Sequence, residues 1–395
     1  VEKSQQYIAD VLGENWQDEY YVWDCCAGTG NLLNGLTNKY HVFASTLDQQ
    51  DVDVMKERIK NGANLLESHV FQFDFLNDEF LPTDGNISTD CRDAARHVPT
   101  DKIGKLPPDL YKIINDPEKR KKLVIYINPP YKEAATTRTK MGTSTNKADV
   151  ATTNRTSQKY KGQIGAAANE LFALFLMRIR CELDGCFISH FSTLKIIQAP
   201  NFEKFRKIFN IKLESLFLMQ ANTFDNVTGI FPIGFFIWNT QIKSAFEQIV
   251  CSIYDDNGIV IQHKTLSGST RDKIINKWLH NYFDNREEIA WLRFVPNDFQ
   301  NNSGIYITFK PNESDIRESR ITKITKTNLI IICVYFAVRK CIEHTWINHN
   351  DQFLFPNNGW INDLDFQSNC LIYTLFHNKN CISCKQGVNH WIPFS

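Results

Sequence analysis

The sequence lacks a net charge, a membrane-length apolar run and an internal repeat. Its 44 Lys and Arg residues balance 44 Asp and Glu residues, so a nucleic-acid partner would require basic side chains gathered on one face. The longest apolar run, residues 329–338, is too short to span a bilayer and predicts a buried strand or helix. Val1 is not followed by a basic and apolar leader. We therefore expect a cytoplasmic globular protein without a membrane partner.

Regularly spaced cysteines are also missing. The chain has 11 cysteines, and an odd, irregular set favours reduced thiols over a disulfide framework. Cys381 and Cys384 form one Cys-x-x-Cys pair, but a zinc site needs four ligands and no second pair stands nearby. We therefore expect no bound metal.

Strand-like and helix-like patterns alternate from Tyr20 to about Asn239. Short β-branched and aromatic runs are followed by stretches with a helical period, as in NELFALFLMRIRCEL. Such alternation predicts an α/β sheet with helices on both faces. After residue 241 the rhythm weakens. We therefore expect a first domain at residues 1–241 and a mixed α+β region at residues 242–395.

Two stretches interrupt the alternation. Residues 84–120 carry turn residues and predict an insertion with one helix. Residues 132–163 are rich in Thr, Ser, Asn and Ala and have an excess of positive charge. That composition buries little apolar surface, so we expect this basic loop to be poorly ordered without a ligand.

A strand-to-helix turn near the start of the chain reads VWDCCAGTGNLL. Its pattern is Asp-x-x-x-Gly-x-Gly, formed by Asp24, Gly28 and Gly30, and the glycines permit a tight turn and close approach of the backbone to a ligand. The lysine of a Walker A loop is absent, which excludes an NTPase phosphate loop. Cys26 and Asn31 belong to the same turn and are included in the expected pocket, although Cys26 is also expected to pack as a small residue.

Acidic residues follow the next two strands. Asp48 stands about twenty residues after Gly28, the offset at which a carboxylate accepts hydrogen bonds from ribose hydroxyls. At the end of the third strand, Asp74 is placed to accept from an adenine amino group and Phe75 to cover its ring. Helix N-capping is the alternative role for both aspartates.

The stretch VIYINPPY ends a strand on Asn128, Pro129, Pro130 and Tyr131. Proline cannot donate to a sheet ladder, so the strand must end there. The residue before a proline is held extended. The result is a stiff loop that presents one amide, two carbonyls and one aromatic ring. A strand-end turn without a function is the alternative.

These motifs, DCCAGTGNLL, LDQQDV, DFLND and NPPY, resemble in their order the S-adenosylmethionine-dependent amino-methyltransferases. They look most like the bacterial N6-adenine DNA methyltransferases of restriction–modification systems, in the gamma motif order. The resemblance covers roughly residues 24–239. It implies a class I methyltransferase fold with a Rossmann-like, doubly wound sheet, S-adenosyl-L-methionine as cofactor and double-stranded DNA as partner. A specificity or restriction subunit is a further implied partner.

The resemblance also implies roles for single residues. Asn128 and the carbonyl of Pro129 would accept the two hydrogens of the adenine amino group, while Tyr131 would stack on a base flipped out of the duplex. Phe224, in the loop between two late strands, would stack on the opposite face, with core packing as its alternative. The family's Phe or Thr-Pro signature is missing from VEKSQQYIADVLGENW, so the residue that holds the methionine end of the cofactor stays open.

The basic loop is expected to close over DNA through phosphate contacts. The side chains considered for those contacts are Arg138, Lys140, Arg155 and Lys159. A spacer loop without such contacts is the alternative.

Three other functions remain open. Methylation of glutamine in release factors also uses an NPPY motif, but those enzymes are small and need no basic loop. Methylation of structured RNA is the second. A catalytically inactive DNA-binding or specificity module is the third, and the intact motifs argue against it. The Pro-Cys loop of enzymes that form 5-methylcytosine is absent, and no nuclease signature occurs.

Overall fold

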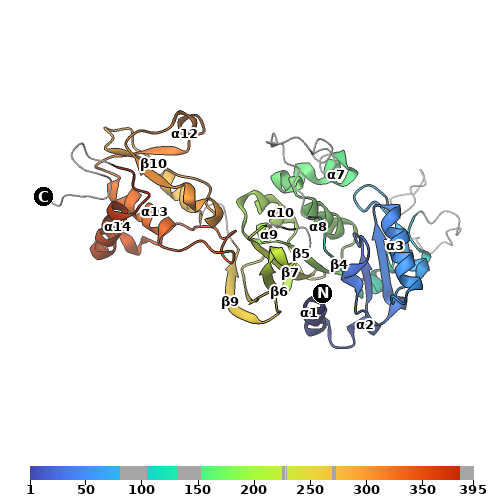
Figure 1. Ribbon diagram of the computed structural model, residues 1–395. Coiled ribbons are helices and arrows are strands. Elements are labelled where there is room, and N and C mark those ends of the chain that lie inside the picture. The colour runs from blue at the N-terminus through green and yellow to red at the C-terminus, as the bar shows by residue number, and fades with distance from the viewer. Residues whose placement is uncertain (81–104, 131–152, 225–226, 228, 269–272, 383–395) are drawn as a thin grey trace. The chain divides into compact units, whose positions relative to one another are not determined.

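The computed structural model describes residues 1–80, 105–130, 153–224, 227, 229–268 and 273–382 (Figure 1). The chain forms two compact units. The first comprises residues 1–197, 201–223 and 233–268, and the second comprises residues 198–200, 224–232 and 269–395.

Within the described residues, the first unit is built on a nine-stranded sheet. Its strands are β1 (Tyr21–Asp24), β2 (Val42–Thr46), β3 (Val70–Gln72), β4 (Leu123–Ile127), β5 (Phe187–Thr193), β6 (Lys212–Gln220), β7 (Pro232–Asn239), β8 (Gln248–Tyr254) and β9 (Val260–Ser267). Their order in the sheet is β3-β2-β1-β4-β5-β7-β6-β8-β9. All residues of β2 and β4 are buried, as expected for strands covered on both faces.

The strand order reverses between β1 and β4. The chain passes from β1 outward to β2 and β3 and then returns to β4 on the other side of β1. Strands β3, β2, β1, β4 and β5 are parallel, whereas β7 is antiparallel to β5. In such sheets ligands bind in the crevice at the carboxyl ends of the strands on either side of the reversal. The predicted α/β sheet is thus confirmed, and its switch point lies between β1 and β4.

Helices connect these strands. They are α1 (Glu2–Leu12), α2 (Trp16–Glu19), α3 (Gln49–Lys60), α4 (Pro108–Asn115), α5 (Pro117–Arg120), α7 (Arg155–Ile164), α8 (Leu171–Glu182), α9 (Lys195–Gln198) and α10 (Glu203–Ile208). Figure 1 shows α3 beside the first strands, and it packs against β2 and β3. Nine residues of α8 are buried, which agrees with its predicted core position.

Several sequence expectations change at this level. The expected helix after the glycine turn is one 3-10 turn, η1 (Asn31–Leu33), because Gly30 and Gly35 take positive φ angles and Asn34 is extended. Residues 84–120 contain two described helices, α4 and α5, rather than one. Since the hairpin β8–β9 extends the large sheet, the first unit reaches Gly268 instead of ending at residue 241.

The second unit is a mixed α+β structure with its own core. A three-stranded antiparallel sheet has the order β11-β10-β12 and is formed by β10 (Ala290–Arg293), β11 (Tyr306–Thr308) and β12 (Ile321–Ile324). Its helices are α11 (Ile275–His280), α12 (Glu313–Arg317), α13 (Leu329–Lys340) and α14 (Leu364–Phe376). The apolar run at residues 329–338 is therefore helical, and α13 packs against α14.

Candidate functional site

The glycine turn follows β1 at the switch point. Gly28 has a φ of 52° and Gly30 a φ of 81°, a region in which side chains with a Cβ are strained. The backbone amide of Ala27 donates to the carbonyl of Ser45 at 2.9 Å and ties the turn to β2. The turn is thus set by its own glycines and by the neighbouring strand.

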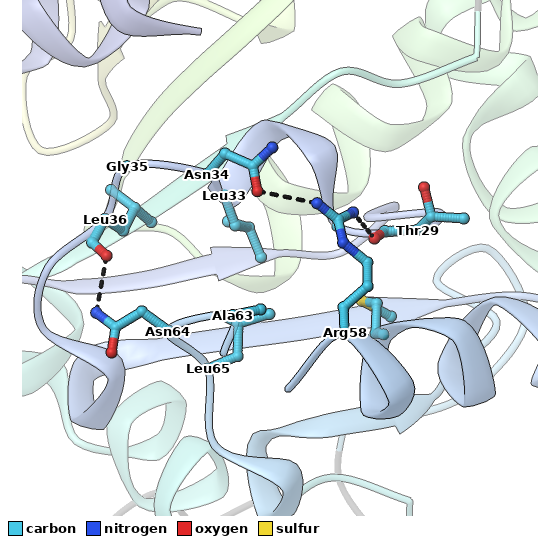
Figure 2. A pocket seen from close by; sticks show the side chains of 11 residues that line it. Thr29, Leu33, Asn34, Gly35, Leu36, Arg58, Ala63, Asn64 and Leu65 are labelled. Carbon is cyan, nitrogen blue, oxygen red and sulfur yellow. Dashed lines mark hydrogen bonds between the residues drawn. The ribbon is translucent and has the colours of Figure 1, made fainter. Parts of the chain in front are cut away.

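Arg58 of α3 forms hydrogen bonds to this turn. Its guanidinium donates to the carbonyl of Thr29 at 2.5 Å, to Oδ1 of Asn31 at 2.8 Å and to Oδ1 of Asn34 at 3.0 Å. Figure 2 shows the Arg58 side chain pointing toward Thr29 and Asn34. These three residues line a cavity of about 220 Å³. The predicted pocket residue Asn31 is therefore engaged on the α3 side. Sequence reasoning missed Arg58, since an arginine near a helix C-terminus is an ordinary feature.

Asp24 is a buried carboxylate at the end of β1. Its side chain is 1% exposed, and the backbone amide of Cys26 donates to its Oδ1 at 3.1 Å. Burial raises its pKa from 3.8 to about 7, although hydrogen bonding by the Cys26 backbone and side chain opposes the rise. Cys26 thus supports Asp24 from within the turn, while Cys25 is buried as a small residue.

Asp48 stands exposed just beyond β2. It occupies the N-cap position of α3, but its side chain accepts no capping hydrogen bond. The N-capping alternative therefore does not account for this carboxylate. Its position beside the glycine turn leaves its oxygens open to a ligand at the carboxyl edge of the sheet.

Asp74 organises the loop after β3. Its Oδ1 accepts from the backbone amides of Leu76 at 3.1 Å and Asn77 at 3.2 Å, and its Oδ2 accepts from Nδ2 of Asn77 at 2.7 Å. This arrangement is an Asx turn. Asp74 therefore has a local structural role, although a carboxylate has about four acceptor sites and these bonds use three.

Phe75 lies in an aromatic cluster rather than at an open edge. Its ring is 2% exposed and stacks on Phe175 with centroids 5.0 Å apart. The guanidinium of Arg178 lies 5.3 Å from the ring centroid and also donates to the Phe75 carbonyl and, at 2.5 Å, to the Asp78 carbonyl. In this packing the ring is committed to the core, so Phe75 fixes the Asp74 loop rather than offering a free face.

The NPP segment begins where β4 ends, directly beside β1. Val22 and Trp23 pair with Val124 and Ile125, so the carboxyl ends of the two strands are neighbours. Asn128 is exposed, Pro129 is buried and Pro130 is exposed. The topology therefore brings Asn128 to the same edge as Asp24. Tyr131 lies outside the described residues.

Helix α1 supplies contacts that the sequence left open. Ser4 is buried, and its hydroxyl shares a hydrogen bond of 2.6 Å with the Tyr126 hydroxyl on β4. Burial raises the pKa of Tyr126, and the Asp24 carboxylate raises it further. Gln5 donates to the Asn34 carbonyl at 2.7 Å. Ser4 and Gln5 are thus the α1 residues that reach the β1–β4 edge, a role that no motif in the segment indicated.

The basic loop differs in part from the expectation. Residues 132–152 lie outside the described residues, including Arg138 and Lys140. Residues 155–164 form α7, which begins with the Asn154 side chain accepting from the Ser157 amide at 2.7 Å. Because tertiary contacts stabilise this helix, the expectation of poor order is wrong for residues 155–163.

Two of the charges expected to meet DNA are paired within the fold. Arg155 forms an ion pair with Glu79, and Lys159 pairs with Glu182 at 2.9 Å. Glu182 also accepts from Tyr160 at 2.8 Å and from Arg178 at 3.0 Å. These contacts dock α7 on α8 and on the Asp74 loop. The contacts of Arg155 and Lys159 with DNA phosphates stay a prediction.

Phe224 is half-buried and belongs to the second unit. Residues 225, 226 and 228 of the same loop lie outside the described residues. Its proposed stacking role therefore stays a prediction.

Neither a metal site nor a membrane helix is found in the parts of the chain that the structure describes. No group of three His, Cys, Asp or Glu side chains there is arranged to hold a metal, and Cys384 lies outside those parts. None of the described helices is both long and apolar enough to cross a bilayer.

Comparison with known proteins gives structural similarity only. No protein-family profile and no curated protein sequence matches the chain. It is similar to the methyltransferase subunit of a type I restriction-modification system from Streptococcus thermophilus, with 14% identity, a TM-score of 0.37 and coverage of 72% of this chain and 52% of that chain.

Two larger restriction enzymes are also similar. The type IIG restriction endonuclease BpuSI gives 16% identity and a TM-score of 0.38 over 70% of this chain and 31% of that chain. The DNA-bound type ISP enzyme LlaBIII gives 11% identity and a TM-score of 0.39 over 75% of this chain and 24% of that chain. The chain thus spans less than a third of either enzyme. Values this low assign no residue a role, so the functional argument rests on the chain's own residues.

Proposed function

We propose that the chain is an S-adenosylmethionine-dependent methyltransferase that modifies the N6 amino group of adenine in DNA, within a restriction–modification system. One observation carries the proposal. The glycine turn with buried Asp24 and the Asn128-Pro129-Pro130 segment end adjacent parallel strands at the switch point. A cofactor pocket and a pair of amine acceptors would therefore share one crevice.

The residues of the glycine turn fit a cationic nucleoside cofactor. Asp24 is buried with a raised pKa, and a positively charged group placed near it would restore its ionised form. Gly28 and Gly30 let the backbone approach a ligand closely. The Asp48 carboxylate makes no capping hydrogen bond and can accept hydrogen bonds from ribose hydroxyls. Asp74 can accept one more hydrogen bond, from an adenine amino group. When bound, S-adenosylmethionine supplies an electrophilic methyl group.

Asn128 and Pro129 fit the needs of a weakly nucleophilic aromatic amine. The lone pair of that amine is delocalised into its ring, and two acceptors aimed at its hydrogens favour the geometry that frees the lone pair. The Asn128 side-chain oxygen and the Pro129 carbonyl are such acceptors, on a loop stiffened by two prolines and carried by buried β4. They would position the amine and stabilise the positive charge that grows on its nitrogen.

Adenine inside a duplex cannot reach this crevice, so the base must be flipped out. Tyr131 follows the acceptors directly and is proposed to stack on the flipped base. Phe224 is proposed to cover its other face. Double-stranded DNA is accordingly the proposed partner, together with a specificity or restriction subunit.

Incubation with tritium-labelled cofactor and unmethylated genomic DNA, followed by nucleoside analysis, tests the substrate. Label in N6-methyladenine supports the proposal. Label in added RNA or in release-factor glutamine instead would overturn it in favour of those amino-methyltransferases. Absence of cofactor binding by calorimetry would identify an inactive DNA-binding or specificity module.

Asn128→Ala tests the chemistry. Turnover should fall at least a hundredfold while cofactor affinity changes little, because Asn128 is proposed to touch the amine. Asn61→Ala, which alters an exposed asparagine at the C-terminal end of α3, should leave both unchanged. If Asn128→Ala keeps turnover within about tenfold, a barrier change of only about 1.4 kcal/mol, the acceptor mechanism is wrong.

A further inference from the structure

A cavity in the second unit has a marked excess of cationic side chains. It has a volume of about 240 Å³ and lies at the C-terminal end of α13, beside the 3-10 helix η9 (Phe299–Gly304) and the turn after α14. Its charged and titratable lining residues are Lys340, Lys379, His344, His377 and Glu343. Gln300, Asn302, Ser303 and Asn378 add polar groups to the lining.

The two lysines come from segments that the fold holds in place. Lys340 donates from Nζ to the Asn302 carbonyl at 2.6 Å. The Lys379 carbonyl accepts from the Ile307 amide at 2.9 Å, which attaches the turn after α14 to β11. The Lys340 ammonium group and the backbone of Lys379 are therefore held by the fold, while the Lys379 side chain is exposed at the cavity.

His377 adds a donor of known tautomer. Its Nδ1 accepts from the backbone amide of Lys379 at 3.0 Å. In the neutral ring the proton must then reside on Nε2, which becomes an N–H donor. His344, at the cavity's exposed side, shares a hydrogen bond of 3.0 Å with His349.

The positive charges in this cavity lack matching negative charges. Within the described residues neither Lys340 nor Lys379 forms an ion pair, and Glu343 is the one carboxylate in the lining. Burial and the positive charges of Lys379 and Arg339 lower the pKa of Lys340 to about 8. Burial, Lys340 and Lys379 lower the pKa of His377. The carbonyls at the C-terminal end of α13 carry a partial negative charge of only about one half. This is too little to neutralise the two positive charges of Lys340 and Lys379.

We propose that this cavity binds an oxyanion of the phosphate class. Lys340 from the end of α13, and Lys379 and His377 from the turn after α14, line one space that is large enough for a phosphate group. If the proposed function holds, the ligand is a phosphodiester of the DNA backbone, and a free phosphate is the other source of the same chemistry. The remaining polar side chains provide neutral donors to the anion.

Thermal unfolding of the full chain in increasing inorganic phosphate, with chloride balancing ionic strength, tests the cavity without any methyl transfer. The wild-type chain should gain stability with phosphate. Lys379→Gln and Lys340→Gln should each lose about tenfold or more in phosphate affinity, the effect of losing one charge-assisted hydrogen bond. Glutamine at position 340 can still donate to the Asn302 carbonyl, which protects the fold.

Lys326→Gln is the matched control. Lys326 is an exposed lysine of the same unit just before the N-terminal end of α13. At about 1.5 Å per residue along the helix axis, it lies roughly 20 Å from Lys340. Its phosphate response should equal that of the wild type. The proposal is overturned if the wild-type chain shows no response to phosphate, or if Lys379→Gln and Lys340→Gln both respond as strongly as the wild type.

A DNA arm distinguishes the two sources. For a backbone phosphate, Lys379→Gln should flatten the dependence of log affinity on log salt by up to about 0.9, and Lys326→Gln should not. A lost phosphate response with an unchanged DNA salt slope supports the anion site and assigns it to free phosphate. Neither the phosphate experiment nor the DNA-binding experiment measures methylation. Their results would therefore test the anion site even if the proposed function were wrong.

Discussion

Asp24 gives the sharpest physical test of the proposed pocket, because its charge is held where water cannot reach it. The perturbation is Asp24→Asn, which keeps an oxygen that accepts from the Cys26 amide and removes the titration. The folded-state pKa of Asp24 is raised from 3.8 to about 7. Its contribution to stability is therefore complete below about pH 4 and is lost as the pH rises through 7.

The magnitude follows from this difference in pKa. Each pKa unit corresponds to about 1.4 kcal/mol, so ionising Asp24 costs the folded state roughly 4 kcal/mol in total. Between pH 5 and pH 8, about 2.5 kcal/mol of that cost should appear. Because the asparagine of Asp24→Asn does not ionise, this variant should not lose stability in this way as the pH rises. A buried amide with unmatched donors would shift the variant by a constant 1–3 kcal/mol at all pH values, so the pH dependence of the difference is what counts.

Urea unfolding at a series of pH values from 5 to 8, followed through the transition of the first unit, measures the effect. The free energy of unfolding of Asp24→Asn should rise relative to the wild type by about 2.5 kcal/mol across that range. Asp53→Asn, which alters an exposed aspartate on α3, is the matched control and should follow the wild type. A difference that stays constant with pH would refute the reasoning and show that Asp24 is charged at little cost.

Three other perturbations test neighbouring parts of the site. Asp48→Ala should weaken cofactor binding by about 1–3 kcal/mol in calorimetry and leave the melting temperature unchanged, since this side chain makes no capping bond; unchanged affinity would remove Asp48 from the ribose role. Arg58→Met should destabilise the first unit by about 1–3 kcal/mol and weaken cofactor binding, because the substitution removes the hydrogen bonds that hold the glycine turn. Lys60→Met, which alters an exposed lysine on the same helix, should change neither stability nor cofactor binding. If the two variants behave alike, Arg58 does not position the turn. Arg155→Gln with Lys159→Gln should leave the salt dependence of DNA binding unchanged, because both charges are paired within the fold; a flatter salt slope would support their contacts with DNA phosphates instead.

Features set by adjacent residues were predictable. Gly28 and Gly30 take the positive φ angles that a strand-to-helix turn requires, and the prolines at 129 and 130 end β4 where expected. The alternation of strands and helices was also readable, because burial on both faces imposes long apolar runs on parallel strands. In each case the physical cause lies within a few residues of the feature.

Other features depended on partners far away in the sequence. Nothing near Arg58 indicated that it would hold Thr29, and nothing near Ser4 indicated a bond to Tyr126, 122 residues away. Phe75 looked available for a ligand, yet Phe175 and Arg178 cover it. The composition of residues 155–163 suggested a solvent-exposed basic loop. In the structure Glu79 and Glu182 form ion pairs with two of its positive charges, and the segment packs as a helix against α8.

The sequence by itself thus determined where the chain must turn, which strands are buried and which polar residues stand at strand ends, because backbone sterics and the period of apolar residues are local properties. Only the tertiary structure decided whether each of those polar and aromatic side chains faces a partner or an open edge. Asp48 and Asp74 show the difference. Both follow a strand, but the Asp74 carboxylate accepts hydrogen bonds from its own loop, while the Asp48 carboxylate accepts no capping hydrogen bond from α3. The packing of distant segments sets that outcome, and no local pattern records it.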